Sequence, residues 1–266
     1  MYKNKKIAII FFARSNSKRL KNKLFKKIFK NSILSHSINI TKNLKIVDDK
    51  IMATTSRKED NKIVNLAKNK GLKVYRGSEN NVLERMFFAY KSINPKPDIL
   101  VRFCCENPVT SDKIIKKYLK IMINKKIDLM SVIKPSNLLF GVAPIILSSR
   151  ALKKIYKKAK NKVYKEHVET YCYDNTKSFK IDYIRESENF FFPDTGLSID
   201  TIEDYERVKN LFKISKIKNY NFDYKRIIKS HSKNKIYIQN LELREYLIKN
   251  YKNFSYSNDI KTANIV

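Results

Sequence analysis

The sequence contains few of the residues that characterise several common classes of protein. Its 266 residues include only three cysteines, and two of these, Cys104 and Cys105, are adjacent, which permits a disulfide only with strain. The histidines are scattered and no Cys-x-x-Cys pair is present, so the sequence shows no zinc motif. Glycine is scarce, and neither a GxxxxGK[ST] loop nor a GxGxxG fingerprint is found. We therefore expect a protein of a reducing compartment.

Long apolar runs and acidic residues are also scarce. Runs such as 7–13 and 142–147 are far shorter than the ~20 residues that span a bilayer, and the polar N-terminus is unlike a signal peptide. Basic residues number 57 against 25 acidic ones, a formal net charge of +32. We expect a soluble, cytoplasmic protein whose charge favours anionic partners such as nucleotides, phosphosugars or nucleic acid. Because lysine, asparagine and isoleucine share A/T-rich codons, nucleotide bias is an alternative source of this charge.

What the sequence does contain is an alternation of short β-rich runs with helical patterns. Strands are predicted at 6–13, 50–54, 72–75, 98–103, 128–133, 143–147, 179–184 and 197–200. Helices are predicted at 32–43, 59–70, 81–93, 111–124, 149–159, 161–173 and from Thr201 onward. The alternation indicates an α/β fold with a mostly parallel sheet and helices on both faces. We expect one main domain at 1–220 and a Lys-rich helical appendage with a frayed end at 221–266.

A cationic loop follows the first predicted strand, from Ala13 to Lys23. It combines two arginines and three lysines with small hydroxylic residues, which suits a triphosphate. Arg14 and Lys23 are placed to clamp phosphate oxygens, and Ser17 to add a hydrogen bond. The alternative is a solvated loop in a protein that is rich in lysine everywhere.

Two acidic residues stand at the predicted ends of other strands. Glu106 follows the strand at 98–103, and Asp200 precedes the last helix. Carboxylates in such positions can hold Mg²⁺, although an Asp before a helix is commonly a cap favoured by the helix dipole. Ligands of open α/β sheets bind beyond the carboxyl ends of the strands. A cationic loop and two carboxylates on one rim are what metal-assisted nucleotidyl transfer requires.

These motifs, taken in order, resemble a known family. The loop carries Ala13, Arg14, Ser17, Arg19, Leu20 and Lys23 in an A-R-x-x-S-x-R-L-x-x-K pattern. The stretches 49–54, 63–67, 74–79, 82–85, 166–168 and 199–204 follow in matching order and spacing. The chain resembles, over roughly residues 5–215, the cytidylyltransferases of the spore-coat polysaccharide type, relatives of the CMP-sialic acid and CMP-ketodeoxyoctulosonate synthetases. The resemblance implies a Rossmann-like, GT-A-like nucleotidyltransferase fold and transfer of CMP from CTP to an acidic or phosphorylated acceptor.

The resemblance also assigns roles to residues. It implies nucleotide binding by Ala13, Arg14, Ser17, Arg19, Lys23, Thr54, Gly77, Ser78 and Glu79, with Arg14, Lys23 and Asp200 as catalytic groups. It implies Mg²⁺ at Glu106 and Asp200, and an acceptor near Arg102, Gly141, Glu166 and His167. A packed or capping histidine is an equal alternative for His167. A homodimer is implied as well, and neither a membrane nor a specific nucleic acid is expected as a partner.

Several positions depart from the family pattern. Asn16 replaces a usual glycine and Lys21 a usual proline, which predicts a less tightly turned loop. Glu106 replaces a usual aspartate, and its longer side chain moves the carboxylate relative to a metal that tolerates misplaced ligands poorly. The segment 141–145 lacks the acidic residues often found there, which predicts a different acceptor.

The sequence therefore favours a CTP-dependent cytidylyltransferase that uses Mg²⁺ and serves glycan precursor synthesis. Three alternatives remain open: a homologue that binds a nucleotide without turnover, a basic nucleic-acid-binding protein, and a glycosyltransferase. Scarce arginine and the absence of an RNP-like or helix-turn-helix pattern weigh against the second. The missing Asp-x-Asp motif weighs against the third.

Overall fold

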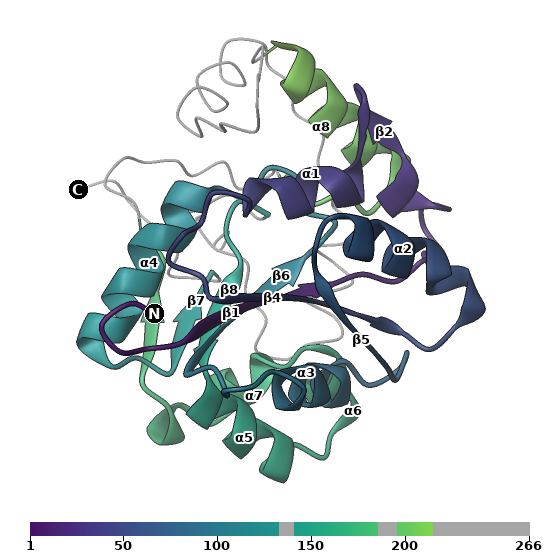
Figure 1. The fold of residues 1–266 in the computed structure, drawn as a ribbon. Coiled ribbons are helices and arrows are strands. Elements are labelled where there is room, and N and C mark those ends of the chain that lie inside the picture. The colour runs from purple at the N-terminus through teal and green to yellow at the C-terminus, as the bar shows by residue number, and fades with distance from the viewer. Residues whose placement is uncertain (133–140, 186–195, 215–266) are drawn as a thin grey trace, which may run out of the picture.

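A mixed seven-stranded sheet forms the centre of the molecule (Figure 1). The structure, a computed structural model, describes residues 1–132, 141–185 and 196–214. The strands are β1 (Ile7–Phe12), β4 (Asp49–Thr55), β5 (Lys73–Gly77), β6 (Ile99–Cys104), β7 (Leu129–Ser131), β8 (Ile145–Ser148) and β9 (Ile181–Tyr183), in the order β5-β4-β1-β6-β8-β7-β9. Within this sheet β8 runs antiparallel to both of its neighbours, and the other pairings are parallel. The predicted mostly parallel sheet is confirmed.

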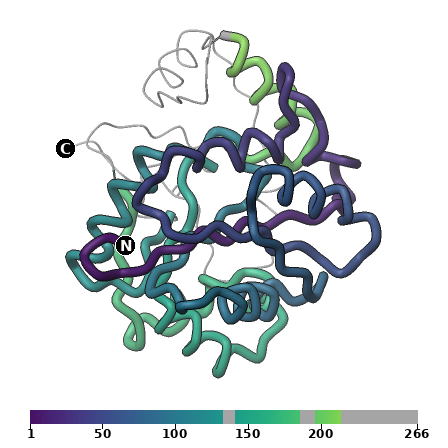
Figure 2. The backbone as a smooth tube through the Cα atoms, viewed as in Figure 1, coloured from purple at the N-terminus to yellow at the C-terminus, as the bar shows by residue number. Residues whose placement is uncertain are grey.

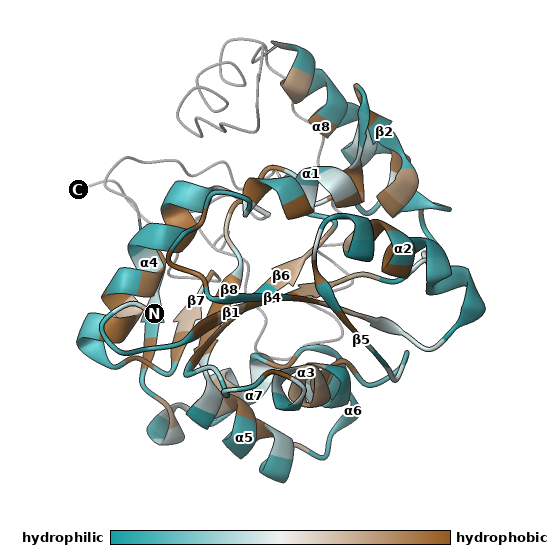
Figure 3. Cartoon of the chain, viewed as in Figure 1, coloured by the Kyte–Doolittle hydropathy of each residue, from teal (hydrophilic) through white to brown (hydrophobic). Residues whose placement is uncertain are grey.

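Helices cover both faces of the sheet, as predicted (Figure 1). One face packs against α1 (Ile33–Ile40), α2 (Asn61–Asn69), α4 (Asp112–Lys125) and α8 (Ile202–Ile214). The other packs against α3 (Val82–Lys91), α5 (Ser149–Lys158), α6 (Lys162–Glu166) and α7 (Thr170–Asp174). Apolar residues line the strands while the outer helix surfaces are hydrophilic (Figure 3). Burial of this apolar surface on both faces is the main driving force for the fold.

Local sequence signals set the ends of the helices. The side chains of Ser32, Asn81, Ser111 and Ser148 each accept a hydrogen bond from a backbone amide in the first turn of α1, α3, α4 and α5. These bonds satisfy amides that the helix itself leaves without partners. Gly71, with φ of +73°, follows α2 in the left-handed conformation expected after a helix end.

A hairpin near residue 30 and the last described helix, α8, lie side by side (Figure 2). A small hairpin of β2 (Lys27–Ile28) and β3 (Asn31–Ser32) follows the cationic loop, and α8 packs beside it. The hydroxyl of Tyr205 on α8 donates to the carbonyl of Lys27 at 2.6 Å, and the ring of Phe212 contacts that of His36. The segment that contains Asp200 is thereby brought to the loop that contains Lys23, 177 residues earlier in the chain.

Two predicted elements are wrong. Residues 197–200 form no strand, because the amides of Ile199 and Asp200 donate to a loop carbonyl and a side chain instead of to a neighbouring strand. The helix predicted at 161–173 is two short helices, α6 and α7. The backbone of His167 leaves the helical region there (φ −112°, ψ 85°), and its carbonyl accepts from the amide and hydroxyl of Thr170 instead. The predicted appendage at 221–266 lies outside the described residues.

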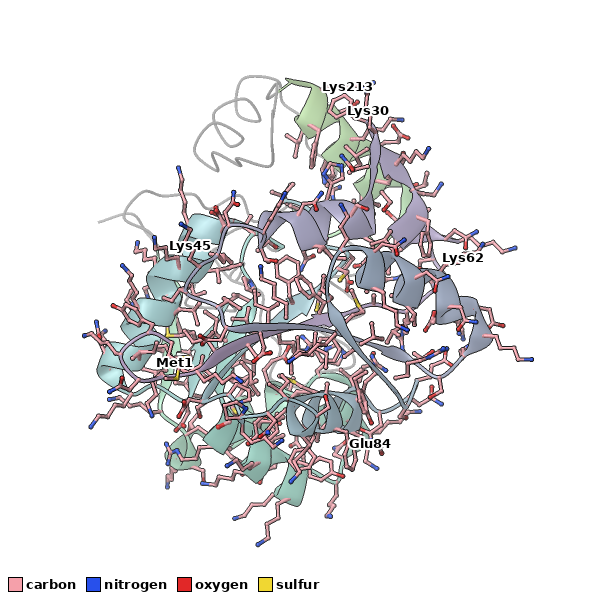
Figure 4. The ribbon with its side chains drawn as sticks, in the orientation of Figure 1. Met1, Lys30, Lys45, Lys62, Glu84 and Lys213 are labelled. Carbon is pink, nitrogen blue, oxygen red and sulfur yellow. The ribbon has the colours of Figure 1, made fainter. Side chains whose placement is uncertain are left out.

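Positive charge is spread around the described part of the molecule. Lys30 and Lys213 lie together at the top of the view, Lys45 lies at the left and Lys62 at the right (Figure 4). Such a distribution fits the nucleotide-bias explanation of the charge better than a single basic groove, which nucleic-acid-binding proteins use. No helix in the described segments has the length and apolar character needed to cross a membrane.

Candidate active site

The cationic loop leaves β1 at the carboxyl edge of the sheet and is fastened there by a buried carboxylate. Asp60, only 1% exposed, accepts from the amide of Ser15 at 2.7 Å and from the hydroxyl of Thr54 at 3.1 Å. Burial raises the pKa of Asp60, but hydrogen bonds from Thr55, Ser15 and Thr54 lower the pKa by more than burial raises it. The pKa is therefore below its usual value and the carboxylate stays ionised. Asp60 therefore ties the loop to the end of β4.

Three residues that the resemblance assigns to nucleotide binding stabilise the backbone of the cationic loop. Ala13 and Thr54 are buried, and the Thr54 hydroxyl is engaged by Asp60. The hydroxyl oxygen of Ser17 accepts from the amide of Leu20 at 3.4 Å. These contacts hold the backbone of the loop and so fix the positions from which its cationic side chains extend.

Lys23 and Arg19 converge on Asp200. The Lys23 ammonium lies 2.8 Å from Oδ1 of Asp200, and an Arg19 guanidinium nitrogen lies 2.9 Å from the same oxygen. Burial lowers the pKa of Lys23, but the Glu106 and Asp200 carboxylates raise it more. Burial likewise raises the pKa of Asp200, and the two cations reverse that effect, leaving it below its usual value. The loop, Glu106 and Asp200 thus form one charged cluster, as the sequence predicted.

The segment that carries Asp200 is anchored along its whole length. The amide of Ile199 donates to the carbonyl of Glu106 at 3.0 Å, which fixes the two acidic positions relative to each other. The amides of Asp200 and Thr201 donate to Oδ2 of Asp204 at 3.0 and 2.9 Å, and the Asp204 amide donates back to the Thr201 hydroxyl at 3.3 Å. This reciprocal arrangement is a capping box.

A buried ion pair supports the capping box from beneath. The guanidinium of Arg207 pairs with Oδ1 of Asp204, and both side chains are almost completely buried. Its Nε also donates to the carbonyl of Gly196 at 3.0 Å, so Arg207 holds the other end of the same segment. Desolvating two charges is costly, and the pair is tolerated because its hydrogen bonds are satisfied. Sequence reasoning missed Arg207, because its burial and its bond to Gly196 are visible only in the folded chain.

Gly141 lies behind this segment. A Cβ atom built on it would come within 2.6 Å of the Ser198 amide nitrogen and 2.8 Å of the Leu197 carbonyl carbon, and its φ is +91°. Its backbone thus packs directly on the chain three residues before Asp200. The structure gives Gly141 this close-packing position next to the site, whereas its predicted contact with the acceptor stays a prediction.

A second cluster gathers on the opposite side of the loop. The guanidinium of Arg14 donates to the carbonyl of Glu79 at 3.2 Å and pairs with Glu166 at 3.3 Å. Arg85 on α3 is buried and donates to the carbonyls of Ser78 and Glu79. Burial, reinforced by nearby Arg14, lowers the pKa of Arg85 to about 10, so it remains charged at neutral pH. The predicted nucleotide segment 77–79 is therefore held by two arginines.

Asn16 has a specific partner in this cluster. Its amide nitrogen donates to Oε1 of Glu79 at 2.9 Å, and Arg57 pairs with the other oxygen of Glu79 at 3.1 Å. The side chain that replaces the usual glycine thus links the cationic loop to the segment after β5. This contact shows how the loop accommodates Asn16.

The residues assigned to the acceptor lie against α6 and α7. A guanidinium nitrogen of Arg102 lies 3.6 Å from Glu169, and Glu106, Glu166 and Glu169 are all within electrostatic reach of Arg102. His167 is partly buried, and that burial lowers its pKa, which keeps the imidazole neutral at neutral pH. The structure therefore brings Arg102, Glu166 and His167 together beside the charged cluster.

The cysteines of the site are not nucleophiles. Cys104 ends β6 next to Arg102, and burial raises the pKa of its thiol to about 12 despite that arginine. Burial raises the pKa of Cys105 well above its usual value too. Both thiols are protonated at neutral pH, whereas the thiolate is the reactive form.

The carboxylates suit Mg²⁺ better than a metal that needs a full protein cage. Among the described residues, no group of three or more His, Cys, Asp and Glu side chains could enclose a metal ion. Asp200 and Glu106 nevertheless offer two neighbouring hard oxygen donors that already attract cationic groups. Mg²⁺ is usually bound by one or two carboxylates together with substrate phosphates and water. The donor set fits such an ion.

Comparisons with known proteins identify the family of the chain. The model of the family "Cytidylyltransferase" matches residues 7–250. An uncharacterized protein of Methanocaldococcus jannaschii is 37% identical over 229 residues, which cover 86% of this chain and 91% of that protein. The spore coat polysaccharide biosynthesis protein SpsF of Bacillus subtilis is 25% identical over 211 residues, 77% of this chain and 86% of that protein.

A solved structure supports the same conclusion. A cytidylyltransferase from Leptospira borgpetersenii superposes with a TM-score of 0.81 at 28% identity, covering 89% of this chain and 98% of that one. The likeness to this solved structure therefore extends over most of the chain, not only over the sequence motifs. The protein belongs to the cytidylyltransferase family.

Proposed function

We propose that this protein is a Mg²⁺-dependent cytidylyltransferase that transfers CMP from CTP to an anionic small-molecule acceptor and releases pyrophosphate. The observation that carries the proposal is the convergence of Lys23 and Arg19 with two carboxylates, Asp200 and Glu106, at the carboxyl edge of the sheet. Cations for the phosphates and oxygen ligands for a metal are the parts that this reaction needs.

The triphosphate would bind against the cationic loop. Lys23 and Arg14 would contact phosphate oxygens, with Arg19 beside them. The Arg14 side chain is 39% exposed and that of Arg19 49%, so both are accessible to a ligand. Glu79 and the rest of segment 77–79 would lie near the cytosine. As pyrophosphate leaves, Lys23 would stabilise the charge that develops on it.

Asp200 and Glu106 would hold the metal ion. When bound, Mg²⁺ would supply positive charge to the phosphates of CTP and so lower the barrier to displacement at the α-phosphorus. The hydrogen bond from the Ile199 amide to the Glu106 carbonyl holds the two backbone segments that carry these carboxylates next to each other. Fixed geometry matters here because Mg²⁺ requires near-ideal octahedral coordination.

The acceptor would bind between Arg102 and α6. Arg102 provides positive charge beside Glu106, and Glu166 and His167 border the same place. A phosphate or phosphonate oxygen is already ionised at neutral pH and can attack without a base, whereas the anomeric hydroxyl of an acidic sugar needs one; in both cases Arg102 would attract the negative charge of the acceptor. An acidic sugar or a phosphorylated or phosphonate compound is therefore the acceptor class that we propose.

The cellular setting follows from the same reasoning. The similarity to a spore coat polysaccharide biosynthesis protein supports a role in making precursors of a surface polysaccharide, such as a capsule. CTP is a cytoplasmic substrate, which supports a cytoplasmic reaction. A homodimer and a separate appendage at 221–266 remain proposals that rest on the sequence.

The test is pyrophosphate release with Mg²⁺, each of the four nucleoside triphosphates and a panel of sugar acids, sugar phosphates and phosphonates. We expect release only with CTP and one acceptor class, and its loss in Asp200→Ala. Asp182→Ala is the matched control, because Asp182 lies on the edge strand β9 in an exposed pair with Lys125. CTP binding without release from any acceptor would favour a homologue without turnover. Failure to bind CTP would contradict the proposal.

A further inference from the structure

Lys23 and Arg19 pair with Asp200, one of the two carboxylates that we propose as metal ligands. Both place a nitrogen within 3 Å of the same oxygen, Oδ1 of Asp200, at 2.8 and 2.9 Å. Lys23 is also close enough to Glu106 for that carboxylate to raise its pKa. The Lys23 ammonium, with a side chain 13% exposed, therefore lies within the influence of both proposed metal ligands.

Charge counting shows what this arrangement does. Asp200 pairs with two cations, Lys23 and Arg19, and Glu106 adds a second carboxylate near Lys23, so the charges of these four groups cancel. A divalent cation approaching them gains no net attraction and meets repulsion from the ammonium and the guanidinium. Water screens the repulsion from the Lys23 ammonium weakly, because the Lys23 side chain is only 13% exposed and Asp200 only 8%.

We propose that Lys23 and Arg19 pair with Asp200 in place of the metal ion until a triphosphate binds and draws both side chains away. The divalent cation therefore binds well only after the nucleotide. This extends the proposed function by giving the two side chains a second task and by fixing the order of binding. The triphosphate itself brings the negative charge that restores attraction for the metal.

The anchoring of the site decides which partner moves. The backbone of Asp200 is held by Asp204 and that of its neighbour Ile199 by Glu106. Lys23 and Arg19 are long side chains on a loop, and the Arg19 side chain is 49% exposed. Exchange therefore needs only side-chain rotation, while the carboxylates keep their positions for the incoming ion.

The test uses Mn²⁺ alone as the probe, with free Mn²⁺ followed by electron paramagnetic resonance in the absence of nucleotide. We expect weak binding to the unaltered protein and, with Lys23→Met plus Arg19→Gln, affinity at least roughly tenfold higher, because two repelling charges are gone. Adding Asp200→Asn should abolish the gain. Lys21→Met, which removes a charge from the same loop, is the matched control and should change nothing.

Two further measurements keep the outcome unambiguous. Arg19→Gln alone, at a half-exposed position that the fold does not need, should raise Mn²⁺ affinity by a few-fold even where Lys23→Met proves unstable. Calorimetry in EDTA should show that CTP binds the unaltered protein without metal. Tight Mn²⁺ binding without nucleotide, no gain in the variants, or CTP binding that requires metal first would each overturn the inference. The Mn²⁺ measurements need no turnover, so they stand or fall separately from the proposed reaction.

Discussion

Replacing Gly141 by alanine is the sharpest structural test of how the site is built. At this position φ is +91°, and a Cβ atom would lie 2.6 Å from the Ser198 amide nitrogen and 2.8 Å from the Leu197 carbonyl carbon. Both obstacles are backbone atoms, which cannot rotate away as a flexible side chain would. The segment leading to Asp200 must therefore move if the alanine is to fit.

The magnitude has two parts. A non-glycine residue at positive φ costs roughly 1–2 kcal/mol. Overlap with packed neighbours adds about 1–3 kcal/mol on the scale of overpacked cores. Gly71→Ala provides the control, because Gly71 also has a positive φ, of +73°, but a Cβ there would meet nothing within 4 Å. Alanine also restricts the unfolded chain more than glycine does, which stabilises both variants by a similar free energy. This contribution cancels when the two variants are compared with each other.

The assay is urea unfolding, combined with CTP and Mn²⁺ binding. We expect Gly141→Ala to lower the free energy of unfolding by about 2–5 kcal/mol, and Gly71→Ala by only the ~1–2 kcal/mol of the backbone conformation. Gly141→Ala alone should also weaken Mn²⁺ binding in the presence of CTP, since it displaces Asp200. Equal losses of stability in the two variants, or intact Mn²⁺ affinity in Gly141→Ala, would refute this reasoning.

Three other predictions concern buried polar groups. Asp204→Asn leaves the buried guanidinium of Arg207 without its charge partner and should cost about 3–5 kcal/mol in urea unfolding; a loss below ~1 kcal/mol would show that the pair is dispensable. Asp60→Asn should weaken CTP binding in calorimetry by roughly tenfold, because the loop loses an ionised acceptor for Ser15 worth ~1–3 kcal/mol; unchanged affinity would contradict that role. Burial lowers the pKa of His36, so the unfolded chain takes up a proton first and stability should fall as the pH drops below ~6.5. His36→Gln should flatten this decline in thermal melts, and an unchanged slope would speak against it.

Much of the fold could be predicted from the sequence because local signals agree with the final structure. The strands β1 and β6 are short, mostly apolar runs, and Gly71 follows α2 with the positive φ that is common after a helix end. The segment 197–200 reads as a strand because the apolar Leu197 and Ile199 alternate with the polar Ser198 and Asp200. Its amides find partners only in the folded chain, at Glu106 and Asp204, and a single sequence does not contain that information.

The candidate site divides in the same way. The residues that we propose to face a ligand stand in recognisable motifs, such as Arg14 to Lys23 and the run that ends at Asp204. Residues that hold these motifs do not, because their partners are distant in sequence: Asp60 bonds to Ser15 and Arg207 bonds to Gly196. Their roles depend on burial and hydrogen bonding, and only the three-dimensional structure reveals these.

The pairing of Asn16 with Glu79 shows how a departure can be compatible with the site. The sequence predicts a looser loop where the usual glycine is missing. In the structure the asparagine amide donates to Glu79 at 2.9 Å and gives the loop a new attachment. We infer that the substitution leaves the loop in place, whereas the longer side chain of Glu106 bears directly on the geometry of the metal ligands.

The most direct test of the central claim follows the phosphorus atoms of CTP. CTP labelled at the α-phosphorus and CTP labelled at the γ-phosphorus would be incubated separately with the protein, Mg²⁺ and the acceptor panel, with Asp200→Ala in parallel. Nucleotidyl transfer predicts that the α label appears in a CMP–acceptor product and the γ label in pyrophosphate, both lost in the variant. Transfer of the γ label to the acceptor, or the same products from Asp200→Ala, would contradict the account.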